Sequence, residues 1–191
     1  MRVPCALALV MLSARAAWPQ DAASPTPPAP PAPVSAPAPP PTPPPQLTAD
    51  QIRARERMAL VSLSTVVQAQ QSYAALNQGL FDSITCLMQP GQCIPGQKDA
   101  TPVLDPGYHW LEPRLGYVMR IHPGPAASPD QVRRGASPTS TVTFAATVTP
   151  EYPGRTGGRA FCADSAGRMC FTDGSAPPVK DGRCEPCKKL Q

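Results

Sequence analysis

The cysteines are the residues in this chain whose type and spacing could carry chemistry. The sequence has seven, and Cys5 lies in an apolar leader. The remaining six, behind a secretory leader, favour a disulfide framework. We expect three local bonds, Cys86–Cys93, Cys162–Cys170 and Cys184–Cys187. The second is the best founded and the third the least, because Cys184 and Cys187 could instead each reach back to the sheet. The predicted disulfide residues are Cys86, Cys93, Cys162, Cys170, Cys184 and Cys187.

The segment Cys184-Glu-Pro-Cys187 also has the spacing of a thiol redox motif. Such a motif usually opens a helix, whose N-terminal dipole lowers the thiol pKa. Only Lys188-Lys189-Leu190-Gln191 follows it, which is too short for that helix. Thiol redox activity through Cys184 and Cys187 is therefore a minor alternative.

The two histidines do not predict a metal site. His109 falls in a predicted loop and His122 at a predicted strand end, and the chain has no second Cys-x-x-Cys pair to complete a zinc site. We expect both side chains to be exposed to solvent or locally hydrogen-bonded. The sequence predicts no catalytic residue, no cofactor and no bound metal, and we expect that the protein is not an enzyme.

The N-terminal 46 residues read as export and spacer sequence. Met1-Arg2, an apolar run over 3–12 and Ala14-Arg15-Ala16 are typical of a signal peptide of residues 1–16. The apolar run is too short for a membrane span. Residues 17–46 contain a proline-rich tract, which predicts a disordered, extended spacer. We therefore expect an exported protein, periplasmic or extracellular, with no stable membrane span.

Composition and charge narrow the function classes further. The formal net charge is +4, too small to argue for nucleic-acid binding. The basic residues near the C-terminus predict a solvated, mobile tail, with a site for anionic partners as the alternative. They are Lys180, Arg183, Lys188 and Lys189.

The remaining residues, 47–191, predict one globular domain that opens with a long helix. Thr48 and Gln51 form a plausible capping box, and Asn77-Gln78-Gly79 is a stop signal. Apolar residues recur between them at spacings of three and four, which indicates an amphipathic helix of about 28 residues. They are Ile52, Ala59, Leu60, Leu63, Val66, Val67, Tyr73, Ala74 and Leu76.

Strand patterns occupy the second half of the domain. We expect a short helical turn within 80–87, a turn at Pro90-Gly91 and a loop over 94–115, followed by strands at 116–121 and 140–148. The period of two over 140–148 predicts one buried face, carrying Val142, Phe144 and Ala146. A last pair, 159–164 and 168–173, flanks a three-residue loop with Gly167 in the left-handed position, which sets Cys162 opposite Cys170.

Several of these segments, in this order, resemble the globular part of type IV pilins. Residues 59–73 are similar to the second half of the pilin helix, and Gly116-Tyr117 to the entry into its first strand. Residues 147–161 and 164–174 resemble the pilin stretches around "P…pgrtG" and "D..G…dG". The resemblance covers 54–178. It implies an α+β fold: one long N-terminal amphipathic helix packed on an antiparallel sheet of about four strands, stapled by disulfides.

The resemblance carries no catalytic residues with it. The chain lacks the pilin processing site and the apolar half-helix, and a proline-rich spacer stands in their place. We therefore expect a non-catalytic interaction or structural module with a protein partner, accessory to a type IV pilus or a related secretion apparatus. The alternative is a free-standing exported domain that binds a ligand or polymer.

Overall fold

The computed structural model describes residues 45–108 and 116–190, and all statements below concern these residues. The predicted signal peptide, nearly all of the predicted spacer, His109 and the end of the predicted loop 94–115 lie outside the described residues. Within the described part, no helix has the length and apolar character needed to cross a bilayer.

The domain opens with the long helix α1 (Ala49–Leu76), which has the predicted bounds and the predicted length of 28 residues. Thr48 caps it: the Thr48 hydroxyl accepts from the Gln51 amide, and the Gln51 side chain accepts from the Thr48 amide. This reciprocal pair satisfies two donors that a helix start leaves free. At the other end Gln78 and Gly79 take positive φ, 55° and 79°, and the Gly79 amide closes on Ala74 O.

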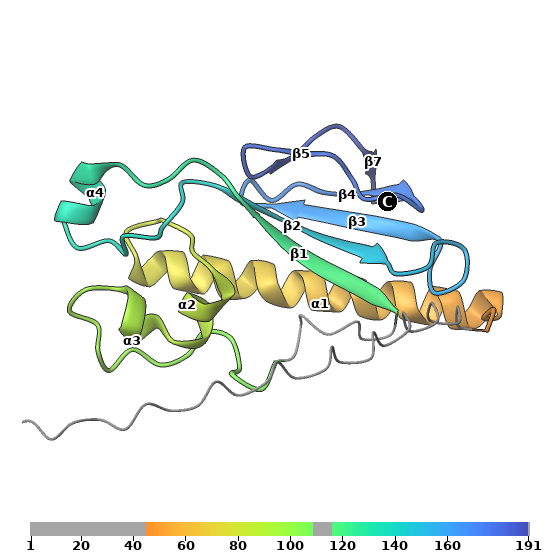
Figure 1. Ribbon diagram of the computed structural model, residues 1–191, viewed down its shortest axis with the longest axis horizontal. Helices are drawn as coiled ribbons and strands as arrows, with labels where there is room; N and C mark the ends of the chain where they lie inside the picture. The colour runs from red at the N-terminus through yellow and green to blue at the C-terminus, as the bar shows by residue number, and fades with distance from the viewer. Residues whose placement is uncertain (1–44, 109–115, 191) are drawn as a thin grey trace, which may run out of the picture. The chain divides into compact units, whose positions relative to one another are not determined.

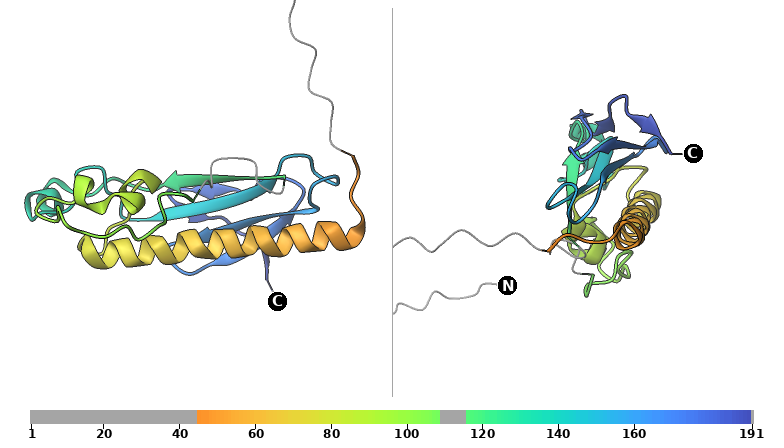
Figure 2. Two further views of the ribbon diagram at one scale, coloured as in Figure 1. Left: turned by 90° about the horizontal axis from the view of Figure 1, so that it is seen from below. Right: turned by 90° about the vertical axis from the view of Figure 1, so that its right-hand side faces the viewer.

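One face of α1 lies against the sheet, along β2 and β3. Buried residues of the helix recur along one face at steps of four and three, with two alanines beside them: Ala59, Leu63, Val66, Ala69, Gln70, Tyr73 and Ala74. Figure 2 shows α1 running along the domain as one layer, with the sheet as a second layer over it. Leu76, which the apolar pattern placed on the buried side, is 40% exposed. The helix begins at residue 49, so it is the first element of the domain and not the N-terminus of the chain.

The sheet has five antiparallel strands in the order β1-β2-β3-β4-β7, one more than predicted. Their bounds are β1 (Tyr117–Pro123), β2 (Phe144–Pro150), β3 (Arg159–Asp164), β4 (Met169–Asp173) and β7 (Lys188–Lys189). A small separate ribbon pairs β5 (Val179–Lys180) with β6 (Arg183–Cys184). The first four strands follow one another in space in chain order, so each neighbouring pair is joined without a crossover.

The β3–β4 hairpin confirms the predicted register and loop. Cys162 pairs with Cys170, and Phe161 with Phe171. Gly167 has φ 77° and its amide bonds Asp164 O, which closes the loop of Ser165, Ala166 and Gly167. A residue with a Cβ is disfavoured at such a φ, so this glycine fixes the turn and with it the register of both strands.

Strand β2 corrects the expectation of a single buried face. Phe144 and Ala146 do pack toward the helix, but Ala145 and Thr147, on the other face, are 0% and 2% exposed. Val142, expected to be buried, precedes β2 and is 46% exposed. The second face is buried because the C-terminal part of the chain, including β6, lies over β2 and β3. Alternation within one strand cannot reveal a cover supplied from residues far along the chain.

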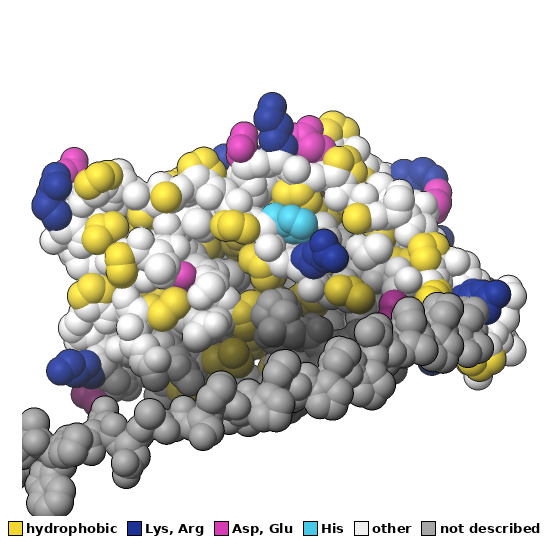
Figure 3. Space-filling model, in the orientation of Figure 1, with side chains coloured by type: hydrophobic (Ala, Val, Ile, Leu, Met, Phe, Trp, Pro, Cys, Tyr) yellow, Lys and Arg dark blue, Asp and Glu magenta, His cyan; other side chains and the backbone are white. Residues whose placement is uncertain are grey.

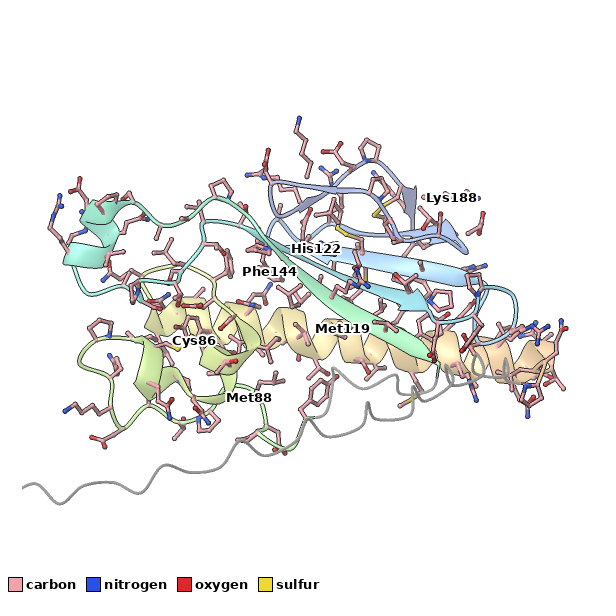
Figure 4. All side chains as sticks on the ribbon, in the orientation of Figure 1. Cys86, Met88, Met119, His122, Phe144 and Lys188 are labelled. Carbon is pink, nitrogen blue, oxygen red and sulfur yellow. A yellow bond between two sulfur atoms is a disulfide. The ribbon has the colours of Figure 1, made fainter. Side chains whose placement is uncertain are left out.

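Short helices and loops form the end of the domain near the C-terminus of α1 (Figure 1). They include α2 (Ile84–Met88), α3 (Pro90–Cys93) and α4 (Pro129–Arg133). Pro90-Gly91, predicted as a turn, begins α3, and described residues 94–108 contain no helix or strand, as predicted. The core between helix and sheet includes Met119 and Phe144, labelled in Figure 4, and Phe81 packs on Phe144 with ring centroids 4.9 Å apart.

Candidate functional site

The C-terminal strap, residues 174–190, is the part of the domain that differs most from prediction. We expected a solvated, mobile tail, but the strap contains β5, β6 and β7 and joins the main sheet through β7. Two disulfides, Cys162–Cys184 and Cys170–Cys187, fasten it to β3 and β4. The predicted bonds Cys162–Cys170 and Cys184–Cys187 are therefore wrong, and the alternative, in which Cys184 and Cys187 each reach back to the sheet, is the arrangement found. The predicted Cys86–Cys93 bond is confirmed.

The failed pairing has a geometric cause. Cys162 and Cys170 do face each other across the hairpin, as the register predicts. Both side chains lie on the face of the sheet away from α1, where the strap brings two further cysteines against them. Cα separations are 6.1 Å for Cys162–Cys184 and 5.6 Å for Cys170–Cys187, both within the usual disulfide range. Opposition across a hairpin permits a disulfide but does not select it once a third segment covers the same face.

The Asp164 carboxylate ties the strap to the hairpin without a covalent bond. One oxygen accepts from the backbone amides of Ala166 and Arg168, at 3.0 and 3.1 Å, and the other from the amide of Cys184, at 3.0 Å. The Arg168 guanidinium donates to Cys184 O at 2.7 Å. Asp164 is 1% exposed, so these amide donors take the place of water around its carboxylate. The same residue thus shapes the β3–β4 turn and positions β6.

A close backbone approach holds the turn of the strap between β5 and β6. Thr143 donates to Asp181 O at 2.8 Å, and a Cβ placed on Gly124 would lie 1.9 Å from Thr143 Oγ1 and 2.8 Å from Asp181 O. Only glycine fits at position 124. The strap is therefore seated on the loops that flank β1 and β2 as well as on the hairpin.

The four basic residues of the strap fall into two pairs, one across β5 and β6 and one in β7. Lys180, Arg183, Lys188 and Lys189 are all exposed. Lys188 pairs with Asp173 and also lies over the Phe171 ring, 5.9 Å from its centroid, beside Arg159 at 4.8 Å. On the visible face of Figure 3, basic and acidic side chains are interspersed. This distribution gives the anionic-partner alternative no specific support.

In the described part of the chain, the Cys-x-x-Cys pair is not joined by a disulfide of its own, and His122 is locally hydrogen-bonded. Cys184 and Cys187 are bonded to different partners and not to each other, so the Cys-x-x-Cys spacing does not form a redox disulfide in this state. His122, on β1, shares a hydrogen bond with Thr147 Oγ1 at 2.8 Å. Burial, and then the charge of Arg120, lower the pKa of His122 below its ordinary value. Among the described residues no three His, Cys, Asp or Glu side chains gather in a way that could hold a metal ion.

The sequence did not predict a buried polar cluster, which lies around Asp82. Asp82 is 5% exposed, and its carboxylate accepts hydrogen bonds from five groups. The donors are Ser137 Oγ at 2.6 Å, the Ser83 amide at 2.7 Å, Thr139 Oγ1 at 3.0 Å, Tyr73 OH at 3.2 Å and Ser140 Oγ at 3.3 Å. The side-chain amide of Gln70 exchanges two bonds with the Asp82 backbone. Burial, and then the Asp82 charge, raise the pKa of Tyr73.

This Asp82 cluster joins the end of α1 to residues 137–140, which belong to the long connection between β1 and β2. Asn77 adds a second bridge, because its amide nitrogen donates to Ser140 Oγ at 2.7 Å and its oxygen accepts from the Ser137 amide at 2.8 Å. The available signal was weak: one aspartate between apolar residues in Leu80-Phe81-Asp82-Ser83-Ile84, and two amides, Gln70 and Asn77, at core spacing in α1. Every buried side-chain nitrogen and oxygen of the cluster has a hydrogen-bond partner, and a fully satisfied buried network holds its members in one arrangement.

The outward side of α1 carries three of the exposed large apolar side chains. From Met58 to Leu76 the helix contains no charged residue. Met58, Val61 and Leu76 are 50%, 58% and 40% exposed. Exposed apolar groups scattered singly are ordinary. Here Met58 and Val61 lie close together on a stretch of the helix without charge, whereas Leu76 lies about four turns further along it.

No protein-family model, curated protein or solved structure matches the chain.

Proposed function

We propose that the protein is an exported, non-catalytic interaction module, related in fold to the globular part of type IV pilins, that serves as an accessory to a type IV pilus or a related secretion apparatus. The observation that carries the proposal is the order and arrangement of elements: one 28-residue helix, followed by antiparallel strands in chain order that pack on its inner face. This is the arrangement that the resemblance of residues 54–178 to pilins implies.

Two further features support an exported binding role. Three disulfides suit an oxidising compartment outside the cytoplasm. Residues 58–76 of α1, which include no charged residue, offer an outward surface on which a second helix or an apolar partner could pack without separating an ion pair or burying a charge.

The test is co-sedimentation with surface filaments. Filaments are sheared from cells that produce the full chain, washed with high salt and sedimented, and the protein is followed by an epitope tag. Cells that lack filaments provide the control for sedimentation of the protein by itself. Retention on washed filaments is the expected result. Recovery in the soluble fraction alone would remove the filament-accessory proposal and favour a free-standing binding domain.

A pair of variants then tests the surface. Val61→Glu places a charge on the outward face of α1, and Val142→Glu places the same charge at another exposed valine, before β2. Both valines are about half exposed, so neither change should unfold the domain. We expect Val61→Glu to reduce retention on filaments and Val142→Glu to leave it unchanged. If washed filaments retain both variants as well as they retain the unchanged protein, the outward face of α1 is not the contact surface.

A further inference from the structure

The four cysteines that bind the strap to the sheet form one cluster with graded access. Cys162, Cys170 and Cys184 are at most 1% exposed and pack with Ala145. Cys187 is only partly buried and lies between the exposed residues Pro186 and Lys188. A thiol reagent can therefore approach the Cys170–Cys187 bond at Cys187, while the Cys162–Cys184 bond is enclosed.

The register of the hairpin places Cys162, a second possible disulfide partner of Cys170, beside the Cys170–Cys187 bond. Cys162 and Cys170 are directly opposed, and opposed residues in an antiparallel pair have Cα atoms about 4.5–5.5 Å apart. Disulfides form over Cα separations of about 4.4–6.8 Å. Cys170 can thus bond Cys162 without a shift of β3 or β4, as an alternative to bonding Cys187.

We propose that Cys170–Cys187 is a site of thiol–disulfide exchange, that its reaction partner is a dithiol reductant, either a small molecule or a protein oxidoreductase, and that exchange passes inward to Cys162. A thiolate of the dithiol attacks Cys187 Sγ, forms a mixed disulfide and releases the Cys170 thiolate. The second thiol of the reductant displaces Cys187, so the reductant leaves as its disulfide and Cys187 is a free thiol.

The Cys170 thiolate then attacks Cys162 Sγ. A Cys162–Cys170 bond forms, the Cys162–Cys184 bond breaks, and Cys184 leaves as a thiolate that takes up a proton. The two electrons and two protons of the dithiol end on Cys184 and Cys187. The protein retains one disulfide across the hairpin and carries a free Cys-x-x-Cys dithiol in the strap, which gives the 184–187 spacing a use that the oxidised state does not show.

Exchange removes both covalent ties of the strap at once. The non-covalent contacts that remain include the bonds of Cys184 to Asp164 and Arg168, the Thr143–Asp181 bond, the Gly174–Gly158 bond, the Lys188–Asp173 pair and the two-residue pairing of β7 with β4. A pairing of two residues is too short to be stable by itself. The strap therefore opens from the sheet far more often, and the buried outer face of β2 and β3, including Ala145 and Thr147, becomes accessible in the open form.

The experiment is a stepwise reduction of the oxidised full chain. The protein is treated with increasing dithiothreitol under native conditions, quenched in acid, alkylated and mapped by peptic digestion and mass spectrometry. The expected intermediate carries alkylated Cys184 and Cys187 with a Cys162–Cys170 bond. In parallel, cleavage by trypsin after Lys180 and Arg183 should accelerate by at least about tenfold, because a released strap opens far more often than a fastened one.

Two variants isolate the inward step. Cys187→Ser leaves Cys170 unpaired without any reductant, so it should rearrange to Cys162–Cys170 with Cys184 alkylated. The double variant Cys162→Ser with Cys184→Ser keeps the outer bond but removes the acceptor, so reduction should leave Cys170 itself alkylated. The Cys86–Cys93 bond, at the other end of the domain from Lys188 in Figure 4, reports in each sample that the fold is intact.

Retention of Cys162–Cys184 after Cys170 and Cys187 have become free thiols would overturn the proposal. So would a Cys187→Ser protein in which Cys170 is alkylated and Cys184 is not. Simultaneous reduction of both bonds, with no Cys162–Cys170 species at any dithiothreitol concentration, would also overturn it, since exchange would then have no inward step.

Discussion

Replacement of Asp82 by alanine tests whether one buried carboxylate organises the end of the domain around α2 and α4. The carboxylate accepts from Tyr73, Ser83, Ser137, Thr139 and Ser140. Alanine removes the acceptor of all five donors at once, whereas asparagine keeps one oxygen and the shape of the side chain. The two variants therefore separate the loss of acceptors from the loss of volume.

The loss of stability in Asp82→Ala depends on which of the five donors can bond water once the carboxylate is gone. Thr139 is exposed, so its hydroxyl can bond solvent. The hydroxyls of Tyr73, Ser137 and Ser140 belong to residues that are at most 1% exposed and lose their acceptor. A buried donor left unpaired costs about 1–3 kcal/mol. Since local rearrangement recovers part of this, we expect Asp82→Ala to lower the free energy of unfolding by about 3–5 kcal/mol. Asparagine, whose oxygen still accepts, should cost about 1–2 kcal/mol.

The assay is urea unfolding of the oxidised domain at neutral pH, followed by circular dichroism. Asp130→Ala is the matched control: its side chain is 67% exposed and forms a surface pair with Arg133, so its loss should cost less than about 0.5 kcal/mol. Backbone amides of 134–141 should also lose protection from hydrogen exchange in Asp82→Ala. If Asp82→Ala and Asp130→Ala unfold at the same urea concentration and with the same dependence on urea, the cluster does not hold the connection between β1 and β2 in place.

Three further predictions concern the core, the strap and pH. Leu63→Ala, at a position that is 0% exposed, should lower the free energy of unfolding by about 3–5 kcal/mol, and Val61→Ala, on the exposed face of α1, by less than about 0.5 kcal/mol; similar urea midpoints would contradict the assigned helix faces. Gly124→Ala should push Thr143 away from Asp181 and speed tryptic cleavage after Arg183, while Gly107→Ala, in an exposed loop, should not; peptide mapping over time distinguishes them. The pKa of His122 is lowered from 6.5 by burial and then by Arg120, so the unfolded chain binds the proton more readily. Stability should therefore fall as pH drops below about 6.5 toward the folded pKa, and His122→Gln should remove that part of the dependence; an NMR titration of His122 with a midpoint at or above 6.5 would show the sign to be wrong.

Local signals in the sequence predicted local structure well. Helix α1 begins and ends at the predicted residues. Its start is set by the capping pair Thr48 and Gln51 and its end by Gln78 and Gly79, and both signals act within one helical turn. Gly167 fixed the β3–β4 turn, and the turn fixed the opposition of Cys162 and Cys170. Each of these features depends on residues that are neighbours in the chain.

The features that the sequence did not predict depend on segments brought together by the fold. The partner of Cys162 could not be chosen from spacing, because Cys184 approaches from a strap whose course is set by Asp164 and Gly124. Ala145 and Thr147 look like solvent-facing positions of a strand until that strap covers them. Asp82 resembles a surface aspartate in the sequence, and only the return of residues 137–140 beside α1 shows that it is buried.

The two cross-links of the strap overlap along the chain: Cys162, Cys170, Cys184 and Cys187 are joined first to third and second to fourth. A single cut by a protease at any peptide bond between Cys162 and Cys187 therefore leaves both fragments attached to each other. With the local pairing that spacing suggested, one cut between Cys170 and Cys184 would have shed the C-terminal piece outright. Where proteases are abundant, this overlapping connectivity lets the domain sustain a broken backbone in its last strands and still keep every residue of the strap on the sheet.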